Sequence, residues 1–212
     1  MTDILNQLPQ KKERKKKGSS QKNKGKVGER AFAELFGKHS GYPFIRIYTS
    51  GASVGRTNNL RLQQLTNGQG LSQLGDIMAP EYMKYQFVLE SKNYADLDFH
   101  NLFINKNSSS IIKWYNEMMF DVHSAYQIMK THKKVIGILC VKITRKGEFL
   151  VINNGMLREI LGDFVLPAQY LSFLLLPKEE LKNVGWDPQC YMVNANEFLK
   201  LNKNMFELEE KS

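Results

Sequence analysis

Two acids and a lysine lie in two short segments whose residue types suit phosphodiester chemistry. Asp76 belongs to "GDIMA", and Glu90 and Lys92 belong to "LESK". Carboxylate oxygens, helped by the Ser91 carbonyl, are ligands that Mg²⁺ prefers, with water and a substrate phosphate in its other positions. Two strand residues span about 6.5 to 7 Å, so Glu90 and Lys92 can both reach one phosphate. There Lys92 would hold or deprotonate an attacking water and offset negative charge in the transition state.

These residues need two neighbouring strands to bring them together. The apolar pattern predicts strands over residues 74–78 and 85–90, joined by a turn around Pro80. Asp76 and Glu90 would then lie side by side at one end of a hairpin. An acid two residues before a lysine is also common on exposed strands, so the alternative is a solvated charge pair with Asp76 as a turn residue.

The surrounding elements predict an α/β domain with a mixed central sheet. The apolar stripe of "GKVGERAFAELFGKH" predicts a helix from Gly25, with Val27 on its buried face. A second helix is predicted over residues 110–132, followed by a hairpin at the turn "TRKG". The polar segment 49–73 is long enough to be a loop that contacts substrate. This order of helices and strands is typical of an α/β fold.

Positive charge is concentrated near the N-terminus. Residues 11–26 hold nine Lys or Arg and one acid, so they contribute most of the formal net charge of +9. The stretch "QKKERKKKGSSQKNKGK" has no apolar residue, and we expect a disordered tail over 1–24 that attracts polyanions. Nucleic acid is favoured over a membrane, because the tail lacks a bulky apolar face. A solubilising or localisation tail is the alternative.

Composition also narrows the setting of the protein. Cys140 and Cys190 lack the close Cys or His spacing that zinc needs, which fits a reducing cytosol. The most apolar stretch, "YLSFLLLP", is too short to span a bilayer, and the N-terminus has no signal-peptide core. The sequence therefore predicts a cytoplasmic protein, prokaryotic or in a phage-infected host cell, with no membrane partner.

Four motifs in chain order resemble the PD-(D/E)xK nuclease superfamily, and within it the Holliday junction resolvases of archaeal and phage type. They are "GKVGERAF", "IRIYTSGAS", "GDIMA" and "LESK", and together they cover roughly residues 25–94. The proline that names the motif is absent before Asp76, where Gly75 stands. The resemblance implies a restriction-endonuclease-like core over 25–155, with a mixed central β-sheet flanked by helices. Residues 156–212 would form an α/β extension packed on this core.

The resemblance also implies a site and its cofactor. Catalysis would involve Glu29, Asp76, Glu90 and Lys92, with Ser50 as a contributor. The cofactor would be Mg²⁺, with Mn²⁺ as a substitute, and its ligands would be Asp76, Glu90, Ser91 and Glu29. Helical periodicity does not separate Glu29 from Glu34 on the same helix, whereas the family position favours Glu29.

The function implied is Mg²⁺-dependent cleavage of branched DNA by a homodimer, at four-way junctions in recombination, repair or phage DNA processing. One alternative is a restriction-type or repair nuclease on linear duplex, and another is an inactive DNA-binding module. The predicted DNA contacts are basic side chains of the tail, the first helix and the long loop: Lys11, Lys12, Arg14, Lys15, Lys16, Lys17, Lys22, Lys24, Lys26, Arg30, Arg56 and Arg61.

Overall fold

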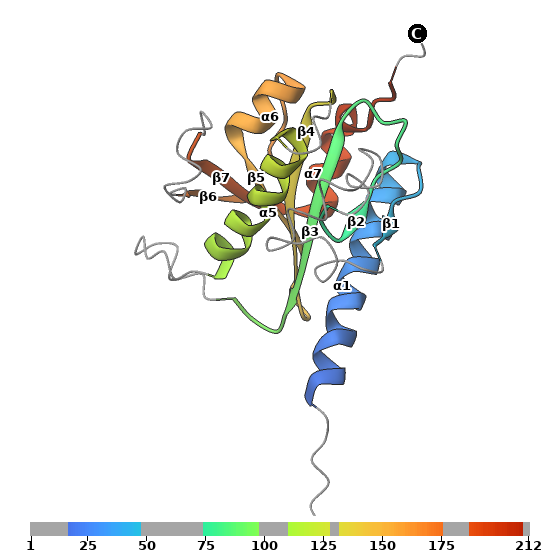
Figure 1. The fold of residues 1–212 in the computed structure, drawn as a ribbon. Coiled ribbons are helices and arrows are strands. Elements are labelled where there is room, and N and C mark those ends of the chain that lie inside the picture. Colours follow the sequence, from blue (N-terminus) through green and yellow to red (C-terminus); the bar gives the residue numbers. More distant parts are fainter. Residues whose placement is uncertain (1–16, 48–73, 98–109, 128–131, 176–186, 210–212) are drawn as a thin grey trace, which may run out of the picture.

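A seven-stranded mixed sheet forms the centre of the molecule (Figure 1). The computed structural model describes residues 17–47, 74–97, 110–127, 132–175 and 187–209. The strand order is β1-β2-β3-β4-β5-β7-β6, and β3 and β4 run parallel while the other neighbours are antiparallel. The strands are β1 (Ile45–Arg46), β2 (Ile77–Met78), β3 (Gln86–Tyr94), β4 (Val135–Ile143), β5 (Gly147–Asn153), β6 (Tyr170–Leu174) and β7 (Gln189–Asn194). This mixed sheet confirms the predicted α/β class.

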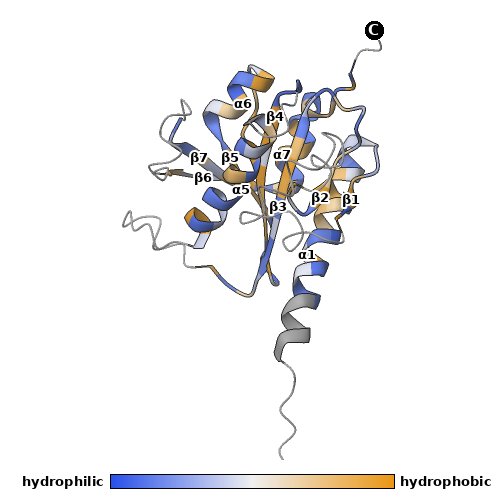
Figure 2. Cartoon of the chain, in the orientation of Figure 1, coloured by the Kyte–Doolittle hydropathy of each residue, from blue (hydrophilic) through white to orange (hydrophobic). Residues whose placement is uncertain are grey.

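Helices cover both faces of the sheet. They are α1 (Lys17–Ser40), α5 (Ser110–Gln127), α6 (Asn154–Leu161) and α7 (Ala195–Leu201), followed by the short 3₁₀ helix η2 (Lys203–Phe206). Val88 of β3 packs in the cluster that contains α5, whereas Phe87 and Leu89 pack in the cluster that contains α1 and α7. Figure 2 shows the apolar residues gathered on these strands. Alternate residues of β3 therefore face different helices.

The first helix begins earlier than the sequence pattern predicts. It starts at Lys17, within the segment 1–24 for which the sequence predicts a disordered tail. Its N-terminal turns project beyond the sheet (Figure 1), and Val27 is 53% exposed instead of buried. Once the packed turns around Phe32 and Phe36 have formed, each added residue extends the helix without a new nucleation cost. Lysine and glutamine favour such an extension.

The C-terminal third of the chain belongs to the same sheet. β7 pairs antiparallel with β5, and β6 pairs with β7, so the sheet continues past the expected core boundary at residue 155. Asn153 links these parts, because its side-chain oxygen accepts from the Met156 N–H at the start of α6 and its amide donates to the Asp187 carbonyl. Among the described residues, no helix combines the length and apolar character needed to cross a bilayer.

Candidate active site

Asp76 is held against the middle of β3 by a tight backbone turn. Its N–H donates to the Leu89 carbonyl at 2.7 Å, and Ile77 then pairs with Leu89 across the β2–β3 hairpin. Gly75 has φ +75°, and a Cβ there would lie 2.7 Å from the Leu89 carbonyl oxygen. A side chain at position 75 would therefore meet both backbone strain and a direct clash. Glycine stands where the superfamily motif has proline because the chain passes so close to β3.

The Asp76 carboxylate lies beside Ser91. The Ser91 N–H donates to Asp76 Oδ2 at 2.9 Å, which fixes the orientation of the carboxylate and leaves its second oxygen out of this bond. In a strand, the N–H and C=O of one residue point to the same edge. The Ser91 carbonyl thus lies on the same edge of β3 as Asp76.

Glu90 and Lys92 form a mostly buried pair on the face of β3 that α5 covers. Lys92 Nζ lies 2.5 Å from Glu90 Oε1, and the two side chains are 21% and 13% exposed respectively. They share the side of β3 on which Val88 packs. β3 continues to Tyr94, so the prediction that the strand ends at these charges is wrong. The pair lies within a paired strand, and this argues against a solvated surface pair.

The carboxylates and the ammonium shift one another's protonation. Burial raises the pKa of the Glu90 carboxyl to about 7, and the nearby Asp76 carboxylate adds to the rise, while Lys92 opposes it. Burial lowers the pKa of the Lys92 ammonium, but the Glu90 and Asp76 carboxylates outweigh this and raise that pKa above its usual value. Asp121 acts electrostatically on Glu90, and Glu117 on Lys92.

These donors fit a hard divalent cation. Asp76 and Glu90 bring two carboxylates close together in a buried place, and the repulsion between them is what a cation relieves. Mg²⁺ is commonly bound by one or two carboxylates with waters and substrate phosphates, and the Ser91 carbonyl adds a neutral oxygen. In the described part of the chain, no three His, Cys, Asp or Glu side chains gather as one metal cage. Asp76, Glu90 and the Ser91 carbonyl are therefore the described groups that could hold such a cation.

Glu29 has a different partner from the one expected. Its carboxylate forms an ion pair with Arg46 of β1, and both side chains are nearly buried, at 13% and 11% exposed. No contact described for Glu29 reaches Asp76 or Glu90. The pair links α1 to the outer edge of the sheet, so the structure leaves Glu29 beside the predicted cluster with its charge already matched.

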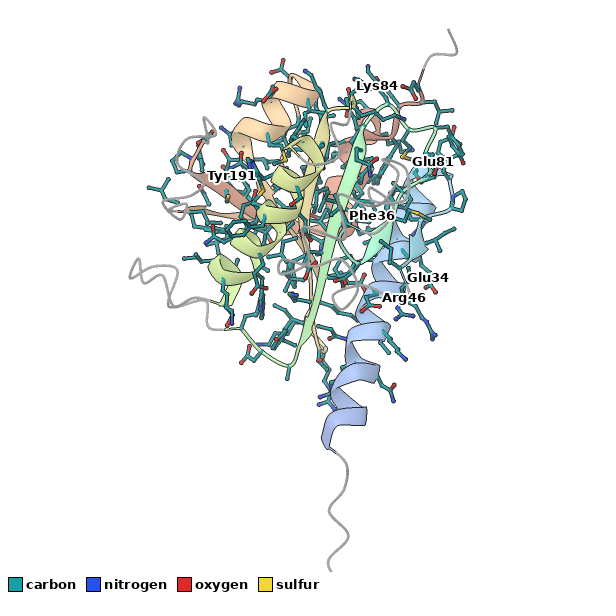
Figure 3. All side chains as sticks on the ribbon, viewed as in Figure 1. Glu34, Phe36, Arg46, Glu81, Lys84 and Tyr191 are labelled. Carbon is teal, nitrogen blue, oxygen red and sulfur yellow. The ribbon has the colours of Figure 1, made fainter. Side chains whose placement is uncertain are left out.

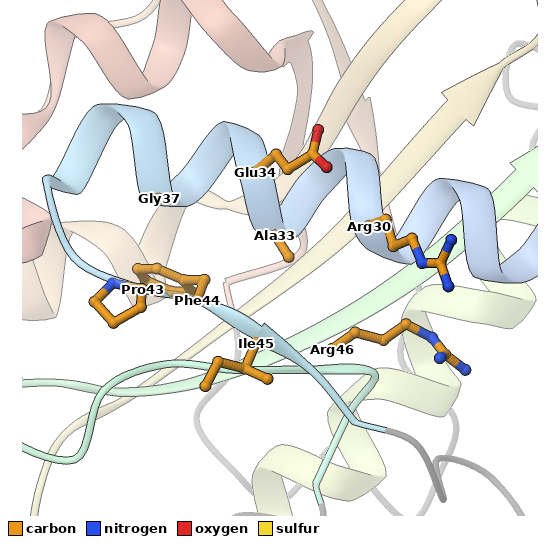
Figure 4. Close-up of a pocket in the computed structure, with 8 residues that line it drawn as sticks. All are labelled: Arg30, Ala33, Glu34, Gly37, Pro43, Phe44, Ile45 and Arg46. Carbon is orange, nitrogen blue, oxygen red and sulfur yellow. The ribbon is translucent and has the colours of Figure 1, made fainter.

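A shallow groove runs along the same helix. It has a volume of about 380 Å³, and Figure 4 shows Arg30 and Arg46 at one end of it and Pro43 at the other. Glu34, the competing acid on α1, is exposed and lines this groove; Figures 3 and 4 label it. Glu34 thus faces solvent on the α1 side.

The first helix packs directly on β3. A Cβ at Gly28 would lie 3.0 Å from Asn93 Cβ and 3.3 Å from Ser91 Oγ. The Asn93 amide donates to the Lys24 carbonyl at 2.8 Å, so α1 is tied to β3 just after Lys92. Gly28, the second glycine of "GKVGERAF", is therefore needed for the close approach of α1 to β3, a role that the motif alone does not reveal.

Sequence reasoning missed the acids that α5 turns toward the site. Glu117 and Asp121 are four residues apart and so lie on one helix face. Their spacing was the available signal, but without the sheet nothing indicated that this face covers Glu90 and Lys92. Gly75 and Asn93 were missed for the same reason, because both act through contacts with a neighbouring element.

The predicted DNA contacts divide into two groups. Lys24, Lys26 and Arg30 are exposed on α1, and Lys17 and Lys22 lie in its first turns. The others, together with the predicted contributor Ser50, lie outside the described residues: Lys11, Lys12, Arg14, Lys15, Lys16, Arg56 and Arg61. The described part of the set follows the end of α1 that projects past the sheet.

Comparison with known proteins identifies a family. The model of the family described as "Phage putative PDDEXK endonuclease" matches residues 20–206. A search of curated proteins found no match, and a search of solved structures found none either. The matched range includes β6 and β7 as well as the motif strands.

Proposed function

Because the chain belongs to this family of phage PD-(D/E)xK endonucleases and is a nuclease, we propose that Asp76, Glu90 and Lys92 form a Mg²⁺-dependent site that cuts branched DNA. The observation that carries the proposal is the Asp76 carboxylate fixed by the Ser91 N–H beside the Glu90–Lys92 pair. A four-way junction is the proposed substrate, as the motif resemblance suggests. Mn²⁺ would substitute for Mg²⁺.

Each residue has a distinct task. Asp76, Glu90 and the Ser91 carbonyl would hold the cation, which supplies Lewis acidity and a bound water of lowered pKa. The Ser91 N–H keeps Asp76 oriented, so this ligand needs no rearrangement. Lys92 is positioned by Glu90 and would donate to the attacking water or to a phosphate oxygen, which offsets the charge that develops at phosphorus.

DNA would reach this site along α1. Lys24, Lys26 and Arg30 are exposed on the helix that packs against β3, and phosphate contacts by such side chains give affinity that falls with salt. The lysine-rich residues before α1 would add to this attraction without reading sequence. Paired cuts in the two strands of a junction need two active sites, so we also propose a two-fold homodimer.

The test is a cleavage assay on two DNAs. The protein is incubated with an end-labelled four-way junction and with the matching linear duplex, in Mg²⁺ or EDTA, and cuts are read on a denaturing gel. Metal-dependent nicks near the crossover that are absent from the duplex would support the proposal. Equal cutting of both DNAs would favour a nuclease of linear duplex, and binding without cutting under any divalent cation would favour a DNA-binding module.

A further inference from the structure

β6 is the last strand of the sheet, and its outer edge carries a full set of hydrogen-bonding groups. The Leu175 N–H donates to the Pro188 carbonyl at 2.7 Å, which continues the register between β6 and β7. Groups alternate along a strand, so the N–H and C=O of Tyr170, Ser172 and Leu174 point away from β7. Within the ranges that the structure describes, no strand pairs with this edge.

The side chains of β6 do not protect this edge. Tyr170 and Leu174 are 51% and 58% exposed, and the strand "YLSFL" contains no charge and no proline. Free strand edges are normally guarded by Lys, Pro, a bulge or a very short length. An uncharged five-residue edge with exposed apolar side chains is instead typical of a strand that pairs with another chain.

The same face continues as an apolar surface. The Tyr170 ring lies 5.5 Å from that of Tyr191, which lies 6.3 Å from that of Phe164. Val165 beside it is 53% exposed. A partner that pairs with the edge would therefore also cover apolar area.

The strand is complementary to a second copy of itself. If two copies of β6 pair antiparallel about a two-fold axis at Ser172, Tyr170 lies opposite Leu174 of the second copy, and Leu171 lies opposite Phe173. Each apolar residue meets an apolar residue on its own face, and the small serines meet on the axis. The three outward-facing residues then all become hydrogen-bonded pairs. A contact in which the same patch serves both copies is what a two-fold dimer requires.

We propose that two copies of this chain dimerise through β6, which joins their sheets into one. This contact would be the interface of the homodimer proposed above, and the role of the interface in cleavage rests on that proposed function. From β3 to β3 the joined sheet would have nine interstrand steps, about 43 Å at 4.8 Å each. Each copy keeps its own site, and the two sites would engage separate stretches of one branched DNA.

Chemical cross-linking tests the axis directly. Ser172→Cys is treated with a short bis-maleimide, with Glu81→Cys as the matched exposed control from the β2–β3 turn at the other end of the sheet. Cys140 and Cys190 are both 0% exposed, so neither gives a background reaction. We expect a covalent dimer from Ser172→Cys alone. Failure of Ser172→Cys to cross-link, or equal cross-linking of both variants, would overturn the interface.

A proline variant tests the hydrogen bonds. The Ser172 N–H is not used by β7, so Ser172→Pro removes a donor only from the outer edge, whereas Ser172→Ala keeps it. In analytical ultracentrifugation, Ser172→Ala should sediment as a dimer and Ser172→Pro as a folded monomer. A dimeric, folded Ser172→Pro protein would contradict the proposal. Neither experiment uses DNA or metal, so failure here is separate from failure of the nuclease assignment.

Discussion

At one outer edge of the sheet, β1 and β2 have two residues each, and the chain comes against β3 at Gly75, just before β2. At the other edge, β6 keeps five residues in register with β7. In the part of the chain that the structure describes, β2 pairs with β3 only at Leu89, next to two carboxylates and a lysine, and the uncharged β6 ends the sheet on the other side. Short strands thus open a sheet to a polar ligand, whereas a long regular edge suits a protein partner.

Loss of Asp76, a proposed metal ligand at the β1–β2 edge, should abolish DNA cleavage. Asp76→Asn should lower the cleavage rate by at least about 10³-fold, because the carboxylate held at Ser91 would no longer carry charge. Binding of a four-way junction should remain, as measured by electrophoretic mobility shift in Ca²⁺. Glu34→Asn on the exposed part of α1 is the control and should cut normally. Persistent cutting by Asp76→Asn would refute the site.

A side chain added at Gly75 should push the backbone before β2 away from β3 and so displace Asp76. Gly75→Ala adds a Cβ against Leu89 at a positive φ, and we expect a loss of about 2 to 4 kcal/mol in unfolding free energy with greatly reduced cleavage. Gly41→Ala is matched, since Gly41 has φ +78° but no atom within 4 Å of the added Cβ. It should lose about 1 kcal/mol and cleave normally. Equal losses in both variants would show that the contact with β3 is unimportant.

The buried acid should make stability depend on pH. The pKa of Glu90 is about 7 in the folded chain against 4.5 in the reference state. Below pH 4.5 both states hold the proton. Between pH 4.5 and 7 only the folded state holds it, so stability falls as the pH rises, and above pH 7 the loss is complete. Glu90→Gln escapes this loss, so it should gain up to about 3 kcal/mol over the parent protein between pH 4.5 and 8 without divalent cations.

Urea unfolding of Glu90→Gln and of the parent protein at pH 4.5 and at pH 8 measures this gain. The control Glu34→Gln removes an exposed acid from α1 and should not reproduce the gain of Glu90→Gln. If the Glu90→Gln difference does not grow with pH, the carboxyl is not buried as described. Saturating Mg²⁺ should raise the stability of the parent protein at pH 8 and leave Glu90→Gln less affected, because binding to the folded state stabilises it.

The smallest effects concern the basic surface that leads DNA to the first edge. Lys24→Ala and Lys26→Ala should each reduce the slope of log affinity against log salt by about one unit. Deletion of residues 1–16, which leaves α1 intact, should reduce it further. Lys200→Ala, an exposed lysine on α7, should leave the slope unchanged. If Lys24→Ala, Lys26→Ala and the deletion of residues 1–16 all leave the slope unchanged, the N-terminal segment is not part of the DNA-binding surface.

The local parts of the site could be predicted from sequence, and the parts made by distant elements could not. The hairpin that brings Asp76 to Glu90 follows from apolar alternation over a few residues, and this alternation correctly predicts that the two segments are adjacent. The end of β3 was misplaced, because Asn93 and Tyr94 pair with β4, almost fifty residues later. Charged residues in a strand look like its end until the neighbouring strand is known.

Helix α1 shows the same limit from the other side. Its periodic stripe predicts a helix with Val27 and Phe32 on one face, but in the structure Gly28 packs on β3, Val27 is exposed and Phe32 is buried. The partner of Glu29 also needed the fold, since Arg46 comes near only when β1 lies under α1. The C-terminal residues matched no motif, and their place in the sheet depends on pairing between β5 and β7.

The parallel pairing of β3 with β4 also affects when the nuclease can form during synthesis. Until the ribosome has released residue 143, β3 has only the brief contact with β2 on one side and no neighbour on the other. Chains emerge at about 5 to 20 residues per second, and parallel pairs wait for their crossover helix. We therefore expect nascent and truncated chains to lack the ordered carboxylate pair. The cutting activity would therefore appear only after most of the polypeptide had been made.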